Sequence, residues 1–294
     1  MKGWVRLTAA AAVLAVLAWR VGTGPFLDGL RAVDGGALAA AAGLAVLTTV
    51  CCAWRWRIVA RGLGVDLPLT TAVAAYYRSL FLNLTLPGGV VGDVHRGLSY
   101  GLRAVAWERS AGQAVQVVLT VVVLLVATSP VQSAMPLVTL ALVMATTAVA
   151  IAARVRPAAG WSRWARLRGA AMRDLRDGLL ARRAWPAIAV ASALVVAGHA
   201  ATFMIAARTV GVTAPPWQMV PLALLVLGAA ALPNIGGWGP REGVTAWAFA
   251  AAGLGASQGV ATAVAYGVMV FVAALPGAAV LVVAWLRREG PVHA

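Results

Sequence analysis

Six runs of about twenty apolar residues constrain this chain more than any other feature, because a helix of that length spans the hydrocarbon core of a bilayer. They cover residues 4–21, 36–54, 112–128, 135–153, 187–207 and 260–286. With 62% hydrophobic and only 11% charged residues, the chain also lacks the polar side chains that cover a water-soluble globule. We therefore predict an all-α polytopic membrane protein with six full spans.

The basic residues lie mainly between these runs. Nine arginines fall between residues 154 and 183, and cytoplasmic loops of membrane proteins are enriched in Lys and Arg. We therefore expect this loop and both termini to be cytoplasmic, and we predict a multi-pass protein of the bacterial inner (cell) membrane. This asymmetry accounts for the formal net charge of +15, so the charge does not predict binding to nucleic acid.

Two further apolar stretches, at about residues 70–89 and 219–254, are interrupted in the middle by Pro and paired Gly. The charge pattern places both ends of the first stretch inside and both ends of the second outside. Each is therefore predicted to be a re-entrant helical hairpin, and the two enter from opposite faces. This is the pattern of an inverted-topology repeat. We predict one transmembrane domain over 1–294, with repeats at about 36–153 and 187–286 around a basic interfacial segment at 154–186.

The two hairpin tips have similar sequences. Each contains Leu-Pro, then Gly-Gly, a further Gly, and an acid close to an Arg. Pro ends a half-helix and Gly allows the chain to reverse, while irregular backbone at membrane depth is tolerated where it lines a cavity. The alternative is that Pro and Gly only bend a helix and that each Arg–acid pair only neutralises charge. The predicted hairpin or gate residues are Pro87, Gly88, Gly89, Gly92, Pro233, Gly236, Gly237 and Gly239.

An arginine at the start of a half-helix suits a phosphate or carboxylate, because the helix N–H groups and the guanidinium both donate to anions. We expect Glu242 to leave Arg241 partly unpaired, and Arg78 to face either the interface or the cavity. Glu108 and Arg109 are predicted to be solvated loop charges, and His199 to be either a core histidine or a proton relay. The candidate substrate-binding residues are Arg78, Asn83, Asp93, His95, Arg96, Asn234, Trp238, Arg241 and Glu242.

The strings LPGGVVGDVHR and LPNIGGWGPREG resemble the paired signatures of the lysylphosphatidylglycerol synthase transmembrane, or flippase-like, family. That family includes the membrane half of the bacterial multiple peptide resistance factor. The resemblance implies movement of phospholipids or lipid-linked groups across the bilayer, with roles for the tip glycines and for Asp93, Arg96, Arg241 and Glu242. This chain departs from the family pattern in having His95 where an apolar residue is expected and Pro240 where a small aliphatic one is usual.

The leading hypothesis is therefore a flippase or scramblase-like lipid translocase for an anionic or aminoacylated phospholipid or a lipid-linked headgroup. The alternatives are a membrane subunit of a glycosyltransferase that uses a polyprenyl-phosphate carrier, and a small-solute secondary transporter. We expect no enzyme activity, cofactor or metal site, because the three histidines and the adjacent Cys51 and Cys52 lack ligand spacing. The expected partners are the membrane lipid and the anionic cytoplasmic leaflet. Formation of a homo-oligomer is compatible with the sequence.

Overall fold

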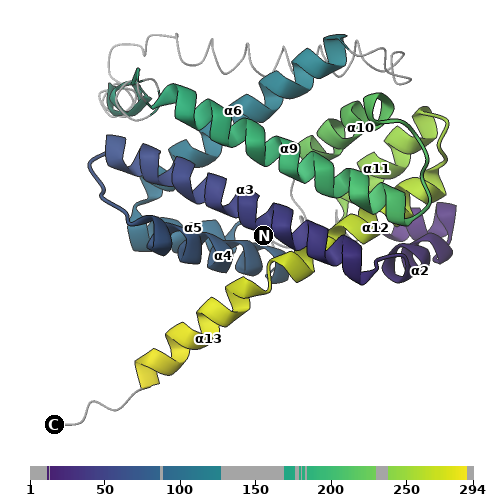
Figure 1. Ribbon diagram of the computed structural model, residues 1–294, viewed down its shortest axis with the longest axis horizontal. Coiled ribbons are helices and arrows are strands. Elements are labelled where there is room, and N and C mark those ends of the chain that lie inside the picture. Colours follow the sequence, from purple (N-terminus) through teal and green to yellow (C-terminus); the bar gives the residue numbers. More distant parts are fainter. Residues whose placement is uncertain are drawn as a thin grey trace.

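The computed structural model describes residues 12, 14–86, 89–126, 169–175, 179, 181, 182, 184–229 and 238–289. Its main elements are α-helices (Figure 1). They are α2 (Gly24–Arg31), α3 (Gly35–Gly62), α4 (Leu69–Thr85), α5 (Val91–Tyr100), α6 (Leu102–Val126), α9 (Trp185–Thr209), α10 (Pro216–Ala229), α11 (Pro240–Ala251), α12 (Ala256–Ala273) and α13 (Pro276–Glu289).

Four stretches of helix are long and apolar enough to cross a membrane: α3, α6, α9 and the stretch Ala256–Leu286, which joins α12 to most of α13. They confirm the predicted helices at 36–54, 112–128, 187–207 and 260–286. The run at 135–153 and most of the run at 4–21 lie outside the described residues. The boundaries differ in one important way, because α6 begins ten residues before the predicted start at residue 112.

Large apolar side chains point outward from these long helices. On α6, Val118 is 59% and Leu125 is 67% exposed, and on α9, Val190 is 56% exposed. Burying a side chain of this size away from water stabilises a protein by about 1.5–3 kcal/mol. An outer surface of this kind is therefore stable in contact with lipid rather than with water.

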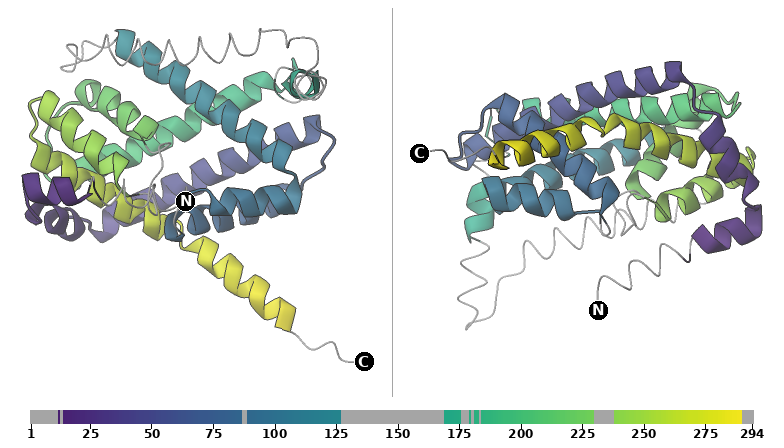
Figure 2. Two further views of the ribbon diagram at one scale, coloured as in Figure 1. Left: turned by 180° about the vertical axis from the view of Figure 1, so that it is seen from behind. Right: turned by 90° about the horizontal axis from the view of Figure 1, so that it is seen from below.

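Helices α3 and α9 pack along each other through the centre of the molecule (Figure 1). Their close approach depends on Gly198 of α9, where a Cβ atom would lie 2.4 Å from Cγ2 of Thr48. Helices α4 and α5 lie beside α3, whereas α10 and α11 lie at the other end of α9 (Figure 2). Helix α13 touches α4 at its start and then extends away from the bundle. The central α3–α9 pair thus lies between two smaller helix pairs.

Each interrupted stretch forms two helices that pack together: α4 with α5, and α10 with α11. Gly89 and Gly239 have φ angles of +66° and +114°, a backbone region that glycine adopts without strain. Gly92 has a different role, since a Cβ there would lie 2.1 Å from the carbonyl oxygen of Ser79. That the two pairs enter the membrane from opposite faces stays a prediction.

The substitution Gly92→Ala is expected to destabilise the packing of α4 on α5, because the added methyl group meets backbone that cannot move aside. Overpacking of this kind costs about 1–3 kcal/mol, so the thermal unfolding midpoint in detergent should fall clearly. Gly97→Ala is the matched control, because its Cβ would come closest to the movable Cδ2 of Leu102, at 2.6 Å, and no nearer than 3.4 Å to the backbone of that residue. Equal midpoints for the two variants would contradict this close contact.

Candidate functional site

Glu108 lies at the centre of a buried ionic cluster, and its side chain is completely buried. Its Oε1 atom accepts hydrogen bonds from Nε and Nη2 of Arg55, at 3.0 and 2.5 Å, and from the Tyr76 hydroxyl at 3.0 Å. Its Oε2 atom accepts from Nη2 of Arg96 at 3.1 Å. One carboxylate on α6 therefore binds side chains from α3, α4 and α5. The Arg96 cluster, as we name it, consists of Arg55, Trp56, Tyr76, Asp93, Arg96, Glu108 and Arg109.

The guanidinium of Arg96 is held by aromatic rings as well as by carboxylates. Its Cζ atom lies 4.5 Å from the ring centroid of Trp56 and 4.1 Å from that of Tyr76, within the range of cation–π attraction. The side chain is fully buried, yet its Nε and Nη1 atoms have no hydrogen-bond partner among the described residues. Arg96 therefore has donor groups that the cluster does not use.

Asp93 forms the outer side of the same cluster. Its carboxylate accepts from the Ser79 hydroxyl at 3.1 Å, from the Asn83 amide at 3.0 Å and from Arg96 at 3.0 Å. Arg109, which is 42% exposed, also pairs with it. The cluster thus contains three guanidinium groups, those of Arg55, Arg96 and Arg109, and two carboxylates. It carries one positive charge in excess.

A second cluster, which we name the Arg241 cluster, consists of Trp238, Arg241, Glu242, Tyr266 and Gly267. Nε and Nη2 of Arg241 donate to Oε1 of Glu242 at 2.9 and 2.5 Å. Its Cζ atom lies 5.2 Å from the Trp238 ring centroid and 5.4 Å from that of Tyr266. Gly267 leaves space for the guanidinium, since a Cβ there would lie 2.5 Å from Nη2.

Two expectations about these charges are wrong. Glu242 does neutralise Arg241, although adjacent helical residues point in different directions, because its long side chain folds back over the start of α11. There its Oε2 atom also accepts from the Gly239 N–H at 2.6 Å. Glu108 is not a solvated loop charge, because α6 begins at Leu102 and places residue 108 on its buried face.

The structure brings six of the predicted substrate-binding residues to the two clusters: five are members, and Asn83 joins through its hydrogen bond to Asp93. Asn83 also accepts from the Gly92 N–H at 2.7 Å. Arg78 is half-buried on α4 and forms no ion pair with a described residue, while His95 is exposed on α5. The remaining predicted residues, Asn234, Pro87, Gly88, Pro233, Gly236 and Gly237, lie outside the described residues.

Sequence reasoning missed several members of the clusters. Arg55 directly follows the apolar run at 36–54, where a loop is expected, but α3 continues to Gly62 and buries it. The sequence could have indicated the burial of Glu108, because it shares one helical face with the small residues Ala104 and Ala111. All three residues are buried. The aromatic members carried no such signal. They are Trp56, Tyr76 and Tyr266.

A small cavity lies between the clusters, and helices α3, α4, α9 and α12 form its walls. Its volume is about 70 Å³, and its lining includes Tyr76 from the Arg96 cluster and His199 of α9. His199 Nδ1 lies 3.3 Å from the hydroxyl of Tyr266, which belongs to the Arg241 cluster. Within the described part of the chain, no group of His, Cys, Asp and Glu side chains is arranged to hold a metal ion.

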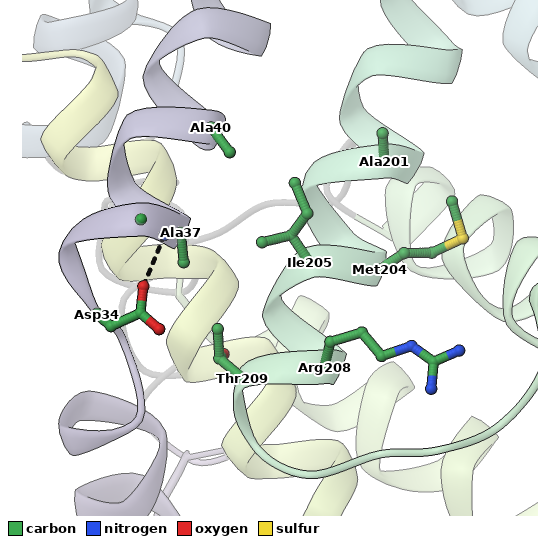
Figure 3. A pocket seen from close by; sticks show the side chains of 9 residues that line it. Asp34, Ala37, Ala40, Ala201, Met204, Ile205, Arg208 and Thr209 are labelled. Atoms are coloured by element: carbon green, nitrogen blue, oxygen red, sulfur yellow. Dashed lines mark hydrogen bonds between the residues drawn. The ribbon is translucent and has the colours of Figure 1, made fainter.

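A larger hollow of about 710 Å³ opens between the start of α3 and the end of α9 (Figure 3). Both charged residues of this hollow form hydrogen bonds with backbone groups. Asp34 accepts from the Ala37 N–H at 2.7 Å, and Arg208 donates to the carbonyl groups of Val212 and Ala214 at 3.1 and 3.0 Å. Both residues thus stabilise helix ends, so the buried clusters are the stronger candidate site.

Long apolar helices with outward-facing apolar side chains and buried ion pairs between them define a multi-pass helical membrane protein. Comparison with known families agrees, because the family model described as the lysylphosphatidylglycerol synthase TM region matches residues 3–277. The match covers most of the chain, so the protein belongs to this lipid-related family. A search of curated proteins found no match.

The substitution Glu108→Gln is expected to destabilise the protein by about 3–5 kcal/mol, because it leaves Arg55 and Arg96 buried without their shared counter-charge. The thermal unfolding midpoint in detergent measures the effect. Asp66→Asn is the matched control, since Asp66 is 86% exposed and lies 3.8 Å from Arg61, and exposed pairs contribute about 0–1 kcal/mol. A Glu108→Gln variant as stable as the control would show that Glu108 does not hold the cluster together.

Proposed function

We propose that this protein moves anionic or aminoacylated phospholipids, or lipid-linked anionic headgroups, between the leaflets of the membrane as a flippase or scramblase-like translocase. One observation carries the proposal: each helix pair with an interrupted centre holds a buried arginine between aromatic rings and a carboxylate. A phosphate can replace a carboxylate as the partner of a guanidinium, because both accept two parallel N–H···O bonds.

The Arg241 cluster supports a specific exchange. In the structure, Glu242 neutralises Arg241 and also accepts from the Gly239 N–H at the start of α11. A lipid phosphate would take the guanidinium, while Glu242 keeps its hydrogen bond to the helix start. The rings of Trp238 and Tyr266 would hold the guanidinium in place during the exchange, so the arginine need not be exposed to hydrocarbon without a partner.

The Arg96 cluster supports a second binding position. Its excess positive charge and the unused Nε and Nη1 donors of Arg96 favour an anion. Arg109 is the most exposed arginine of the cluster and pairs with Asp93. In this proposal an anionic headgroup reaches the cluster from this outer side. In this proposal Arg96 and Arg241 bind the headgroup in turn, which replaces a path through hydrocarbon that costs a bare charge roughly 3–17 kcal/mol.

The proposal also assigns the orientation of the chain and the membrane in which it lies. Both termini are cytoplasmic in the bacterial inner membrane, and the chain acts as a transporter rather than as an enzyme. The basic segment at 154–186 lies on the anionic cytoplasmic leaflet. One described part of it supports a position next to α6, because Arg103 and Trp107 of α6 donate to Asp174. The hydrogen bond from Arg103 holds the pKa of Asp174 below its usual value.

Replacing both charges of the Arg241 cluster tests the function. The double variant Arg241→Gln/Glu242→Gln removes both charges together and leaves no buried charge unpaired, so it should fold. Movement of fluorescent phosphatidylglycerol in reconstituted liposomes should fall roughly 10- to 100-fold, because hydrogen bonds to charged groups contribute about 1.5–3 kcal/mol. Arg241→Lys should retain part of the rate, since it keeps the charge and loses the bidentate geometry.

Arg61→Ala serves as the control, because Arg61 is exposed at the end of α3 and, among the described residues, its ion-pair partner is the exposed Asp66. A double variant that folds and moves lipid at the wild-type rate would contradict the headgroup site. Movement of a small anionic solute but not of lipid would favour the secondary transporter instead.

Labelling of single cysteines tests the topology. In a background with Cys51 and Cys52 replaced, cysteines at the exposed positions Thr70 and Leu102 should react only with a cytoplasmic reagent. Cysteines at Trp217 and Ser257, which are also exposed, should react only from the outside. If Thr70 and Leu102 react from opposite faces, α4 and α5 do not form a re-entrant pair.

A further inference from the structure

The cavity between the clusters is lined by several polar side chains, and apart from Tyr76 the proposed exchange of anions does not use them. At about 70 Å³, it has room for about five water molecules, at roughly 10–15 Å³ for each. Hydroxyl, thiol and imidazole groups give such waters the polar partners that they need. The polar lining residues are Thr48, Thr49, Cys52, Tyr76, His199 and Thr202.

This cavity is linked to both clusters, directly through Tyr76 on one side and through His199 and Tyr266 on the other. Tyr76 lines it directly, and the same side chain stacks on Arg96 and donates to Glu108. On the other side His199 lines it and contacts the hydroxyl of Tyr266, whose ring lies over Arg241. A change of charge at His199 is therefore only one aromatic side chain away from Arg241.

The groups around His199 include no carboxylate on the described cavity lining. Cys52 and Tyr76 face the cavity from α3 and α4, and Tyr266 contacts the imidazole from α12. The charged residues of α6 are Arg103, which pairs with Asp174, and Glu108 and Arg109 of the Arg96 cluster, while α10 has no titratable side chain. Arg55 of α3 binds Ser192, which precedes His199 by about two turns of α9. Beyond Tyr266 lie Arg241 and Glu242.

We propose that this cavity is a hydrated proton-binding site, in which His199 takes up a proton from the aqueous phase and thereby favours anion binding at Arg241. The proposal rests on the proposed lipid translocation, and it assigns that activity a coupling ion. The half-buried imidazole faces the cavity, so a proton can reach it through water without a movement of the helices.

The hydrogen bond to Tyr266 explains how the proton acts. A neutral imidazole and the tyrosine hydroxyl share a hydrogen in either direction, whereas an imidazolium can only donate. Protonation therefore fixes Tyr266 as the acceptor and adds a positive charge next to the hydroxyl of the ring over which Arg241 lies. The Arg241–Glu242 pair is neutral on its own, so an anion bound at Arg241 gives this site a net negative charge that attracts the imidazolium. By linkage, the anion must then favour protonation of His199 by the same factor.

Histidine NMR tests the site without any transport assay. Protein with ¹³C,¹⁵N-labelled histidine is placed in nanodiscs of phosphatidylcholine, and the His199 signal is identified by its loss in His199→Gln. The signal should titrate between about pH 5 and 8, the range in which histidine changes charge. Its midpoint should move to higher pH in phosphatidylglycerol nanodiscs, and that shift should vanish in the Arg241→Gln/Glu242→Gln variant. A His199 signal that stays neutral down to pH 5 overturns the proposal.

Transport measurements provide the second arm. Lipid movement should rise several-fold as the pH falls through the His199 titration, and this rise should be absent in His199→Gln. Tyr266→Phe should keep the titration of His199 and lose its effect on transport, while His293→Gln is the control for loss of a histidine. An unchanged pH profile in His199→Gln overturns the proposal even if the residue titrates. If the wild-type protein moves no lipid, the proposed function fails, and the lipid-dependent shift of the His199 titration alone decides the proton site.

Discussion

A guanidinium stays buried between apolar helices only when a carboxylate faces it, because the cost of taking an unpaired charge out of water amounts to several kcal/mol. Glu108 meets this need for Arg55 and Arg96 together, and Glu242 meets it for Arg241. The consequence reaches beyond charge. Since the groups bound to Glu108 come from α3, α4 and α5, this carboxylate on α6 also fixes how four helices meet.

The two clusters share a chemical plan and differ in how they are built. Each contains an arginine on the second helix of an interrupted pair, a completely buried glutamate, a tryptophan and a tyrosine. In the Arg241 cluster the glutamate comes from the same helix and also caps it, whereas in the Arg96 cluster it comes from the next helix. Aromatic faces hold a guanidinium without consuming its N–H donors, which is consistent with the proposed exchange of anionic partners. That property is what a carrier of anionic headgroups needs.

The sequence predicted the parts of this arrangement that depend on local patterns. Apolar runs located four long helices, Pro and Gly located the interruptions after α4 and α10, and an acid beside an arginine identified Asp93, Arg96, Arg241 and Glu242. Glu108 was missed because its polar neighbours made residues 102–111 resemble a loop, although the helix that begins at Leu102 turns Glu108 inward. Tyr76 and Tyr266 could not be assigned, because a tyrosine in an apolar run says nothing about which arginine it contacts. That choice depends on tertiary packing.

The central claim is that the two buried arginines hold an anionic lipid headgroup, and native mass spectrometry of the protein extracted in mild detergent measures this directly. The wild-type spectrum should show retained phosphatidylglycerol or another anionic lipid. Retention should fall in a variant with Arg96→Gln and Arg241→Gln, because both guanidinium partners are lost. Equal retention of zwitterionic and anionic lipids, unchanged when both arginines are replaced, would contradict the account.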